Sequence, residues 1–207
     1  MADSPELNSN ERLNLTISSK GSEIADTIGV ISVTVNKAVN RIPYARIVLQ
    51  DGDMSDQDFP ISNRDDFKPG AEITIKAGYG TSQDVIFQGV IVKHGIRISG
   101  DNYSRLIIEC RDKAVAMTVG RRNGNYVNTT DSAIISQLIS NYSGLSAEVD
   151  STDLTWKELV QYYCTDWDFL VSRAEVNGLL VIVDDGKVKV KAPQTSGSPE
   201  LNVWCEL

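Results

Sequence analysis

The sequence has little of several residue types on which catalytic and metal sites depend. Its 207 residues include one histidine, His94, and three cysteines, Cys110, Cys164 and Cys205. These four residues show none of the close paired spacing that places ligands on one zinc ion. Three widely separated cysteines also argue against a disulfide framework, so we interpret them as small buried or neutral side chains made in a reducing compartment. The sequence therefore predicts no metal site, no cofactor and no catalytic residue, and a protein that is not an enzyme.

Long apolar runs and an excess of positive charge are also missing. No window approaches the roughly 20 apolar residues that a membrane-spanning helix needs, and the first ten residues are polar and acidic, unlike a secretory signal. The 28 acidic and 20 basic residues give a formal net charge of -8, which repels a phosphate backbone. We expect synthesis in the cytoplasm without a signal peptide, no stable membrane insertion and no nucleic-acid partner.

The N-terminal part of the chain carries the alternation of apolar and polar residues that is typical of strands. Short alternating runs fill residues 13–50, a polar linker with two prolines follows over 51–70, and strand patterns resume over 72–77, 85–93, 95–99 and 105–111. Short and regular spacing of this kind favours an antiparallel barrel or a sandwich, and the pattern leaves the two open. We expect a flexible N-terminus over 1–12 and a β-barrel domain over 13–120.

The C-terminal part changes to helical spacing. Thr130 or Asp131 can cap a helix that runs to Gly144, and Thr165 can cap a second helix that ends at Gly178. A tight hairpin follows, with residues 179–183 and 187–191 flanking the turn at Asp185. The fold class predicted is mainly β with an α+β part: a barrel, then a two-helix region with a hairpin over 121–193. Residues 194–207 read as a linker and a possible strand that starts a second barrel.

Three groups of residues are candidates for functional sites. His94 lies inside a strand-like run, where a lone histidine usually packs or faces solvent. The acidic run from Asp51 to Asp58 lacks the glycine and the bidentate glutamate of an EF-hand, so a solvated loop is favoured over a calcium site. Aromatic side chains could stack on a sugar, although Trp167 belongs to a helix stripe and is expected in the core. The aromatic residues concerned are Trp156, Tyr162, Tyr163 and Trp167.

A local excess of basic residues stands out in this acidic chain. Arg111, Lys113, Arg121 and Arg122, offset by Asp112, leave a charge of about +3. The plain interpretation is a solvated strand end. The sharper interpretation is a docking patch for an acidic partner or a neighbouring subunit. We keep these four residues as the candidate docking site.

Several segments resemble those of one protein family in order and spacing. The stretch TDWDFLVSRAEVNGL at 165–179, preceded by YYC at 162–164 and followed by the hairpin, is similar to a stretch of VgrG-type spike proteins, also known as Rhs-element Vgr proteins, and of phage late-control D-like tail hubs. Upstream segments resemble the first hub barrel of that family and its exit: 67–70, 78–79, 86–89, 103–111, 112–118 and 120–121. The resemblance runs from about residue 13 to residue 191.

The resemblance implies a structural role. Hubs of this family are homotrimers that join a hexameric inner tube to a pointed spike in a type VI secretion system, a free contractile injection particle or a phage tail. By resemblance, the partners are the tube protein, a spike tip or effector, and baseplate proteins, and the machine delivers the protein outside the cell. The sequence departs from the family in lacking most of the second barrel and the β-helical spike. The alternative kept open is a carbohydrate-binding or glycoside-cleaving β-protein that uses carboxylates and exposed aromatic residues.

Overall fold

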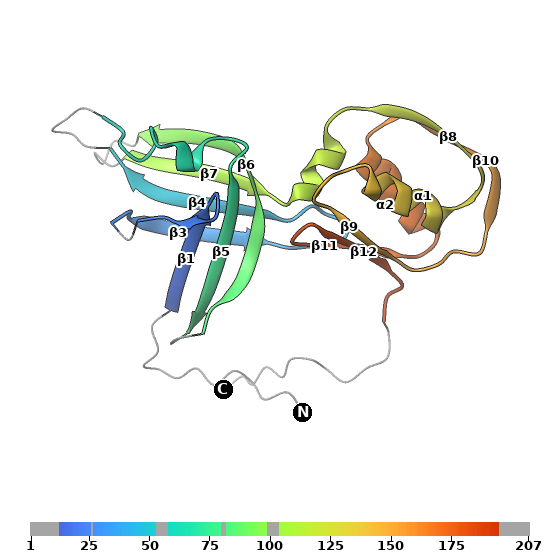
Figure 1. Ribbon diagram of the computed structural model, residues 1–207, viewed down its shortest axis with the longest axis horizontal. Helices are drawn as coiled ribbons and strands as arrows, with labels where there is room; N and C mark the ends of the chain where they lie inside the picture. Colours follow the sequence, from blue (N-terminus) through green and yellow to red (C-terminus); the bar gives the residue numbers. More distant parts are fainter. Residues whose placement is uncertain (1–12, 26, 53–57, 80–81, 99–103, 195–207) are drawn as a thin grey trace, which may run out of the picture.

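The computed structural model describes residues 13–25, 27–52, 58–79, 82–98 and 104–194. The expected flexible N-terminus over 1–12 lies outside these ranges, as does almost all of the expected linker and strand over 194–207. Two lobes lie side by side, one built from a sheet and one that contains both α-helices (Figure 1). The predicted fold class, mainly antiparallel β with a helix-bearing part, is confirmed.

The sheet lobe contains seven strands and one short 3-10 helix. Its elements are β1 (Leu13–Ser19), β2 (Ser22–Glu23), β3 (Val30–Asn36), β4 (Tyr44–Asp51), η1 (Asp65–Phe67), β5 (Glu72–Tyr79), β6 (Asp84–Ile98) and β7 (Ser104–Arg111). The strands form one sheet in the order β2-β1-β5-β6-β7-β4-β3, and every ladder is antiparallel. The sheet bends so that β1 and β5 cross the direction of β3 and β4 (Figure 1). The strands thus enclose one core as a single barrel-like sheet, and not as the two sheets of a sandwich.

Alternation along the strands builds that core, as the sequence predicted. Ile47 on β4, Ile75 on β5 and Ile108 on β7 have no exposed surface, and all three belong to one apolar cluster. Neighbouring positions point outward, because successive side chains of a strand lie on opposite faces. Burying an aliphatic side chain of this size contributes about 1.5–3 kcal/mol. The core therefore follows directly from the period-2 pattern.

One long strand, β6, replaces the two strands expected over 85–93 and 95–99. The strand continues through His94, and its pairing with β7 shifts register between Ile91 and Lys93. A bulge of this kind bends a strand without ending it, which explains why the apolar pattern breaks there. At Gly89 on the same strand, a Cβ would lie 2.2 Å from the carbonyl oxygen of Arg111. Only glycine permits that close approach of the two strands.

The segment expected as a polar linker over 51–70 is mostly exposed in its described part, but Asp51, Ser62 and Phe67 are buried against the sheet lobe. Phe67 in η1 is fully buried in the core. Asp51 was expected in a solvated loop, but it is only 4% exposed. Its carboxylate accepts hydrogen bonds from the backbone N–H groups of Ile61, at 3.0 Å, and Ser62, at 2.8 Å. Asp51 thus closes the loop on itself, because a buried carboxylate needs donors. Asp53 and Asp56 lie outside the described residues.

The helix lobe wraps a two-stranded arm and a three-stranded sheet around two helices. Its elements are η2 (Lys113–Thr118), β8 (Arg122–Thr130), α1 (Asp131–Ser140), β9 (Ser146–Val149), β10 (Thr155–Cys164), α2 (Asp166–Val176), β11 (Leu180–Asp184) and β12 (Lys187–Lys191). The hydroxyl of Thr130 caps α1 and that of Thr165 caps α2, as predicted. Gly144 and Gly178 both have positive φ after these helices, at 80° and 67°.

The predicted hairpin is present, and two strand pairings around it were not predicted. Asp185 and Gly186 have φ values of 50° and 78°, as the two central residues of a type I′ turn require. Strand β12 also pairs in parallel with β9, and β8 pairs with β10. β8 escaped prediction because the sequence RNGNYVNTT lacks strict apolar alternation. Its fold depends on a partner about 30 residues along the chain.

The core of the helix lobe includes two side chains that precede the predicted domain boundary. Ala114 and Met117 of η2 are fully buried with Ile134 of α1 and Leu170 of α2. The boundary near residue 120 stays a prediction. The side chains nonetheless divide into two apolar clusters, one for each lobe.

A set of polar contacts, here called the clasp, joins the two lobes. The turn between β3 and β4 places Asn40 beside β11, where its N–H donates to the carbonyl of Val181 at 2.8 Å and its side-chain oxygen accepts from the N–H of Val181 at 2.9 Å. The buried carboxylate of Asp112 accepts from the N–H of Gly186 at 3.0 Å. Gln88 on β6 donates its N–H to Asp185 at 3.1 Å. The clasp fixes the β11–β12 hairpin to the sheet lobe.

Candidate functional site

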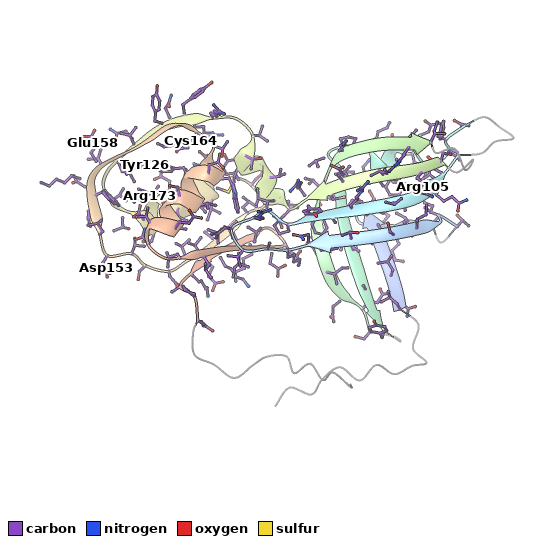
Figure 2. The ribbon with its side chains drawn as sticks, turned by 180° about the vertical axis from the view of Figure 1, so that it is seen from behind. Arg105, Tyr126, Asp153, Glu158, Cys164 and Arg173 are labelled. Carbon is purple, nitrogen blue, oxygen red and sulfur yellow. The ribbon has the colours of Figure 1, made fainter. Side chains whose placement is uncertain are left out.

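The outer surface of the helix lobe is formed by a two-stranded arm, β8 and β10. Figure 2 shows the arm passing around the helices, with Tyr126 directed toward them and Glu158 on the far side of the strand pair. On the inner face, Tyr126 stacks on Phe169 of α2 with ring centroids 5.8 Å apart. On the outer face, Val127 is 57% and Val160 55% exposed. Nothing described in this chain covers that outer face.

A buried carboxylate anchors one end of the arm to both helices. Asp131, at the start of α1, is 1% exposed and receives Arg173 of α2 at 2.6 Å and 3.0 Å. It also accepts from the indole N–H of Trp156 on β10 at 3.0 Å and from Asn177 at 2.9 Å. The guanidinium of Arg173 lies 4.9 Å from the centroid of the Trp156 ring. One carboxylate thus ties together α1, α2 and β10.

The charge of Asp131 is stabilised by these donors. Burial by itself raises the pKa of Asp131. The hydrogen bonds to Asp131, of which that from Arg173 contributes most, lower the pKa by more, so it lies below its ordinary value. Asp131 therefore stays ionised at neutral pH. A carboxylate held in this way acts as a structural anchor, because a general acid needs a pKa near the working pH.

A second buried carboxylate anchors the other end of the arm. Asp166, at the start of α2, is 1% exposed and accepts from Gln161 of β10 at 2.8 Å and from the hydroxyl of Tyr142 at 2.6 Å. Arg122 of β8 lies 3.7 Å from the same carboxylate. Burial, followed by the contact with Asp166, raises the pKa of Tyr142 to about 12. Tyr142 therefore remains a donor to Asp166 across the physiological pH range.

Two tyrosines project from a distortion at this end of the arm. The register of β10 with β8 shifts between Gln161 and Cys164, and Tyr163 adopts a φ of 43°. A left-handed conformation costs a non-glycine residue about 1–2 kcal/mol. The side chain of Asn123 holds it by accepting from the N–H of Tyr163 at 2.7 Å. Tyr162 is 81% exposed as a result.

The structure separates the four residues of the predicted docking site. Arg111 lies over the ring of Tyr44 on the sheet lobe, and Lys113 forms an ion pair with Glu72 at 2.7 Å. Arg121 and Arg122 lie at the tyrosine end of the arm, with Arg121 5.2 Å from the centroid of the Tyr163 ring. Arg121, Arg122, Tyr162 and Tyr163 form what we call the tyrosine–arginine end. That all four basic residues contact a partner stays a prediction.

The other residues proposed from the sequence take part in packing or in internal hydrogen bonds. His94 shares a 2.8 Å hydrogen bond with the hydroxyl of Ser62. Trp167 is buried in the core, as expected. Trp156 is held between Asp131 and Arg173, so the two tryptophans do not form an open platform with Tyr162 and Tyr163. Burial raises the pKa of the Cys110 thiol to about 12, which keeps it neutral. Cys205 lies outside the described residues.

The described part of the chain shows neither a metal cluster nor a membrane-spanning helix. Among those residues, no group of three or more His, Cys, Asp or Glu side chains is placed to hold a metal ion. No helix in the described ranges is long and apolar enough to cross a membrane. Sequence reasoning missed the anchors Asp131 and Asp166, since each carboxylate meets its donors only in the folded chain. The only signal was their position at helix starts, where acidic residues are common.

A family model described as the Alg8 N-terminal domain matches residues 9–205. The chain belongs to the Alg8 N-terminal domain family. The name of the family describes a type of domain and no reaction. A search of curated proteins by sequence finds no match to this chain.

Solved structures resemble this chain much more in fold than in sequence. A 43 kDa tail protein of prophage MuSo2 from Shewanella oneidensis has a TM-score of 0.65 at 12% identity, covering 87% of this chain and 53% of that one. A tail protein from Neisseria meningitidis has a TM-score of 0.66 at 14% identity, with 90% and 52% covered. An E. coli component of the type VI secretion system, described as similar to the T4 tail proteins gp27 and gp5, has 0.63 at 14%, with 88% and 50% covered.

These similarities confirm the resemblance to tail hubs at the level of the fold. The fold of this chain is shared with the tail proteins over most of its length. The chain spans about half the length of each of those structures. At identities of 12–14%, the similarity extends to the fold and does not identify individual site residues.

Proposed function

We propose that the chain is a structural component of a contractile tail or injection apparatus and forms part of the hub between the inner tube and the spike. The observation that carries the proposal is the fold shared with two tail proteins and a type VI secretion component. In this role the protein works as a homotrimer and contacts a hexameric tube protein, a spike tip or effector, and baseplate proteins. It is made in the cytoplasm and leaves the cell with the machine or in a tail-like particle.

The internal chemistry of the helix lobe supports a mechanical role over a catalytic one. Asp131 and Asp166 are each surrounded by three or more polar partners on other elements. Carboxylates bound in this way hold elements together, and at 1% exposure both are closed to a substrate. The clasp then joins this lobe to the sheet lobe through Asn40 and Asp112. Such a unit can transmit mechanical force from one lobe to the other.

The tyrosine–arginine end supports a docking role. Tyrosine and arginine are enriched among residues that dominate binding energy at interfaces, and here two of each gather where the backbone is held in a costly conformation. Strain of this kind is found where the surrounding structure holds a residue for function. A closed ring of identical subunits needs a surface on each subunit that contacts a different surface on the next. The arm is the surface that we assign to such a contact.

Labelling of intact particles tests the tail role. An antibody raised against this chain is applied to tail-like particles purified from a strain that encodes it. We expect label at one end of the particle and peptides of this chain in the mass spectrum of the particles. Unlabelled particles without those peptides contradict the proposal. The native mass of the full-length protein tests the trimer, since a strict monomer contradicts that part.

A matched pair of charge reversals tests the docking surface. Arg121→Glu changes the tyrosine–arginine end and leaves Arg122 beside Asp166, whereas Lys157→Glu changes an exposed residue elsewhere on β10. We expect Arg121→Glu to enter particles at least about tenfold less than the parent, with Lys157→Glu unaffected. Equal incorporation of both variants removes the tyrosine–arginine end from the interface. Circular dichroism checks that both variants are folded.

A further inference from the structure

The outer face of the sheet lobe is basic, although the chain as a whole is acidic. Glu109 of β7 lies between Arg46 of β4 and Lys93 of β6. Arg97 of β6 lies opposite Arg105 of β7. These side chains point away from the core, since the alternate positions of β4 and β7 form it. We call this surface the basic face, and its basic residues are Arg46, Lys93, Arg97, Arg105 and Arg111. Figure 2 shows it toward the viewer.

Several charges of the basic face are not neutralised nearby. Arg46 and Arg97 form no ion pair with the residues that the structure describes. Lys93 approaches Glu109 only to 3.6 Å, and its side chain is 69% exposed. Five of the 20 basic residues of the chain lie on this face but only one of the 28 acidic residues, which leaves 27 acidic against 15 basic residues elsewhere. Charge complementarity therefore favours an acidic partner surface, and a second copy of this chain offers one.

Helix α2 presents an acidic stripe to solvent. Asp168, Ser172 and Glu175 are exposed and lie on one side of the helix, because residues three and four apart share a face. Within the described ranges neither carboxylate forms an ion pair, and Glu175 accepts from Asn40 at 3.3 Å. Val176 beside them is 64% exposed. This surface, which we call the α2 stripe, thus combines two carboxylates with an apolar side chain.

The charges of the two surfaces match in spacing. Lys93 and Arg97 are four residues apart on one strand, which separates them by about 13 Å. Asp168 and Glu175 are seven residues apart on one helix, which separates them by about 10 Å. A helix that lies along β6 can therefore bring each carboxylate to one base.

The two surfaces also allow a close approach. Gly95 lies between the two bases of β6, and a Cβ added there would have no atom within 4 Å. Ile107 of β7 lies opposite Gly95 and is half-buried. Ser172, at the middle of the α2 stripe, has a short side chain that can lie over the glycine. Val176 can then contact Ile107, which gives the contact an apolar centre between charged ends, as protein interfaces have.

We propose that the basic face of one copy binds the α2 stripe of a second copy, with Asp168 and Glu175 beside Lys93 and Arg97. Within one chain α2 packs against α1, η2, β10 and β11, so the contact joins two chains. The two surfaces differ and belong to different lobes, so the contact is heterologous and adds copies head to tail. The inference rests on the self-association in the proposed function and adds a contact to that of the arm, but it does not need the tail role.

Charge exchange in the full chain tests the contact. Lys93→Glu with Arg97→Glu reverses the basic face, and Asp168→Lys with Glu175→Lys reverses the α2 stripe. Sedimentation velocity measures self-association, and circular dichroism checks the fold. We expect each double variant to associate at least about tenfold more weakly than the parent. The chain with all four changes carries complementary charges again and should recover association to within about threefold of the parent.

A matched control and the parent separate the possible results. Lys20→Glu with Lys157→Glu changes the net charge as much as reversal of the basic face does, at exposed positions elsewhere, and should match the parent. Weak association of both double variants with recovery in the fourfold variant supports the contact. If the parent associates and the double variants match it, or if the fourfold variant does not recover, the contact is wrong while the proposed trimer stands. A parent that stays monomeric overturns both.

Disulfide trapping gives an independent test that leaves every charge in place. Gly95→Cys puts a thiol at the centre of the basic face, and Ser172→Cys puts one at the centre of the α2 stripe. Both variants also carry Cys164→Ser and Cys205→Ser, while Cys110 is fully buried. The two proteins are mixed and oxidised with glutathione disulfide. We expect a mixed dimer whose tryptic peptides link position 95 to position 172.

The control for trapping replaces one partner. Ser151→Cys, at an exposed serine between β9 and β10, takes the place of Ser172→Cys in the same background. We expect at least about tenfold less mixed dimer with this variant, because its thiol lies outside the α2 stripe. Equal yields with the two partners, or links only between two copies of the same variant, would show that the basic face does not bind α2.

Discussion

The two lobes of this protein use different means to fix their strands. In the sheet lobe, seven strands share one continuous set of ladders, and the buried carboxylate of Asp51 holds the loop that follows β4. In the helix lobe, the arm has only two strands, and two isolated strands are marginal in water. Two buried carboxylates, Asp131 and Asp166, tie that arm to the helices. Where ladders are short, polar side chains set the position of the strands.

The difference also distinguishes the exposed arm, which we propose as the docking surface, from the paired strands of the sheet. A strand inside a seven-stranded sheet is paired on both sides and has little freedom to change. The arm leaves its outer face to solvent, while Asp131 and Asp166 hold its inner side. A surface of this type can vary in sequence without loss of the fold. We therefore expect changes in binding to map to the arm, the basic face and the α2 stripe, and changes in stability to map to the sheet core and the anchors.

The largest expected loss of stability comes from the core of the sheet lobe. Phe67→Ala removes a fully buried ring, and such changes cost about 3–5 kcal/mol because a cavity remains. Urea unfolding followed by circular dichroism measures the change. Tyr79→Ala, at the exposed end of β5, should stay within about 0.5 kcal/mol of the parent. Similar losses for both variants would contradict the assignment of the core.

Removal of Arg173 tests the anchor of the helix lobe. Arg173→Leu leaves Asp131 buried without its main partner, and breaking a buried pair from one side costs about 3 kcal/mol or more. The same urea experiment measures the loss. Asp131→Asn combined with Arg173→Leu removes the uncompensated charge and should recover part of it. A loss under about 1 kcal/mol for Arg173→Leu would mean that the pair does not anchor the arm.

The clasp should give an intermediate effect. Asn40→Ala removes the acceptor for the N–H of Val181, and an unsatisfied backbone donor costs about 1–2 kcal/mol. We expect the unfolding transition to broaden as the lobes lose cooperativity. Lys37→Ala removes an exposed ion pair with Asp184 and should cost at most about 0.5 kcal/mol. A sharp transition with an unchanged midpoint in Asn40→Ala would show that the lobes do not depend on this contact.

Acid should weaken the helix lobe through Asp131, with the smallest effect. Its pKa is lowered in the folded state from an ordinary value of 3.8. The stabilisation is therefore fully present above about pH 4 and is lost as the pH falls through the lower folded value. The free energy of unfolding, measured from about pH 6 down to about pH 2, should fall less steeply in Asp131→Asn. Identical slopes for parent and variant would rule out this linkage.

The sequence predicted those features that depend on neighbours in the chain. The caps at Thr130 and Thr165 and the turn at Asp185 were identified because a few adjacent residues determine them. The alternation of β4 and β7 likewise identified their buried faces. Local patterns therefore gave the fold class and most elements, including the helices and the hairpin.

The features that escaped prediction depend on distant partners. The burial of Asp51 depends on a loop that returns to it ten residues later. The strand β8 forms because β10 lies beside it, and the anchor at Asp131 needs Arg173 and Trp156 from two other elements. The docking patch of Arg111, Lys113, Arg121 and Arg122 stays a prediction, and the sequence did not show that Arg111 contacts Tyr44 and Arg121 contacts Tyr163. The spacing of apolar residues along the chain does not reveal contacts between such distant residues.

The pairing of Asn40 with Val181 has a consequence for the order of folding during synthesis. The two residues are 141 positions apart, so the turn that carries Asn40 leaves the ribosome long before its partner. At about 5–20 residues per second, the delay is roughly 7–28 s. The sheet lobe is complete in sequence at Arg111 and can form its ladders within that time. The turn at Asn40 is then among the last parts of that lobe to reach its final contacts, together with Gln88, whose partner Asp185 follows Val181 in the chain.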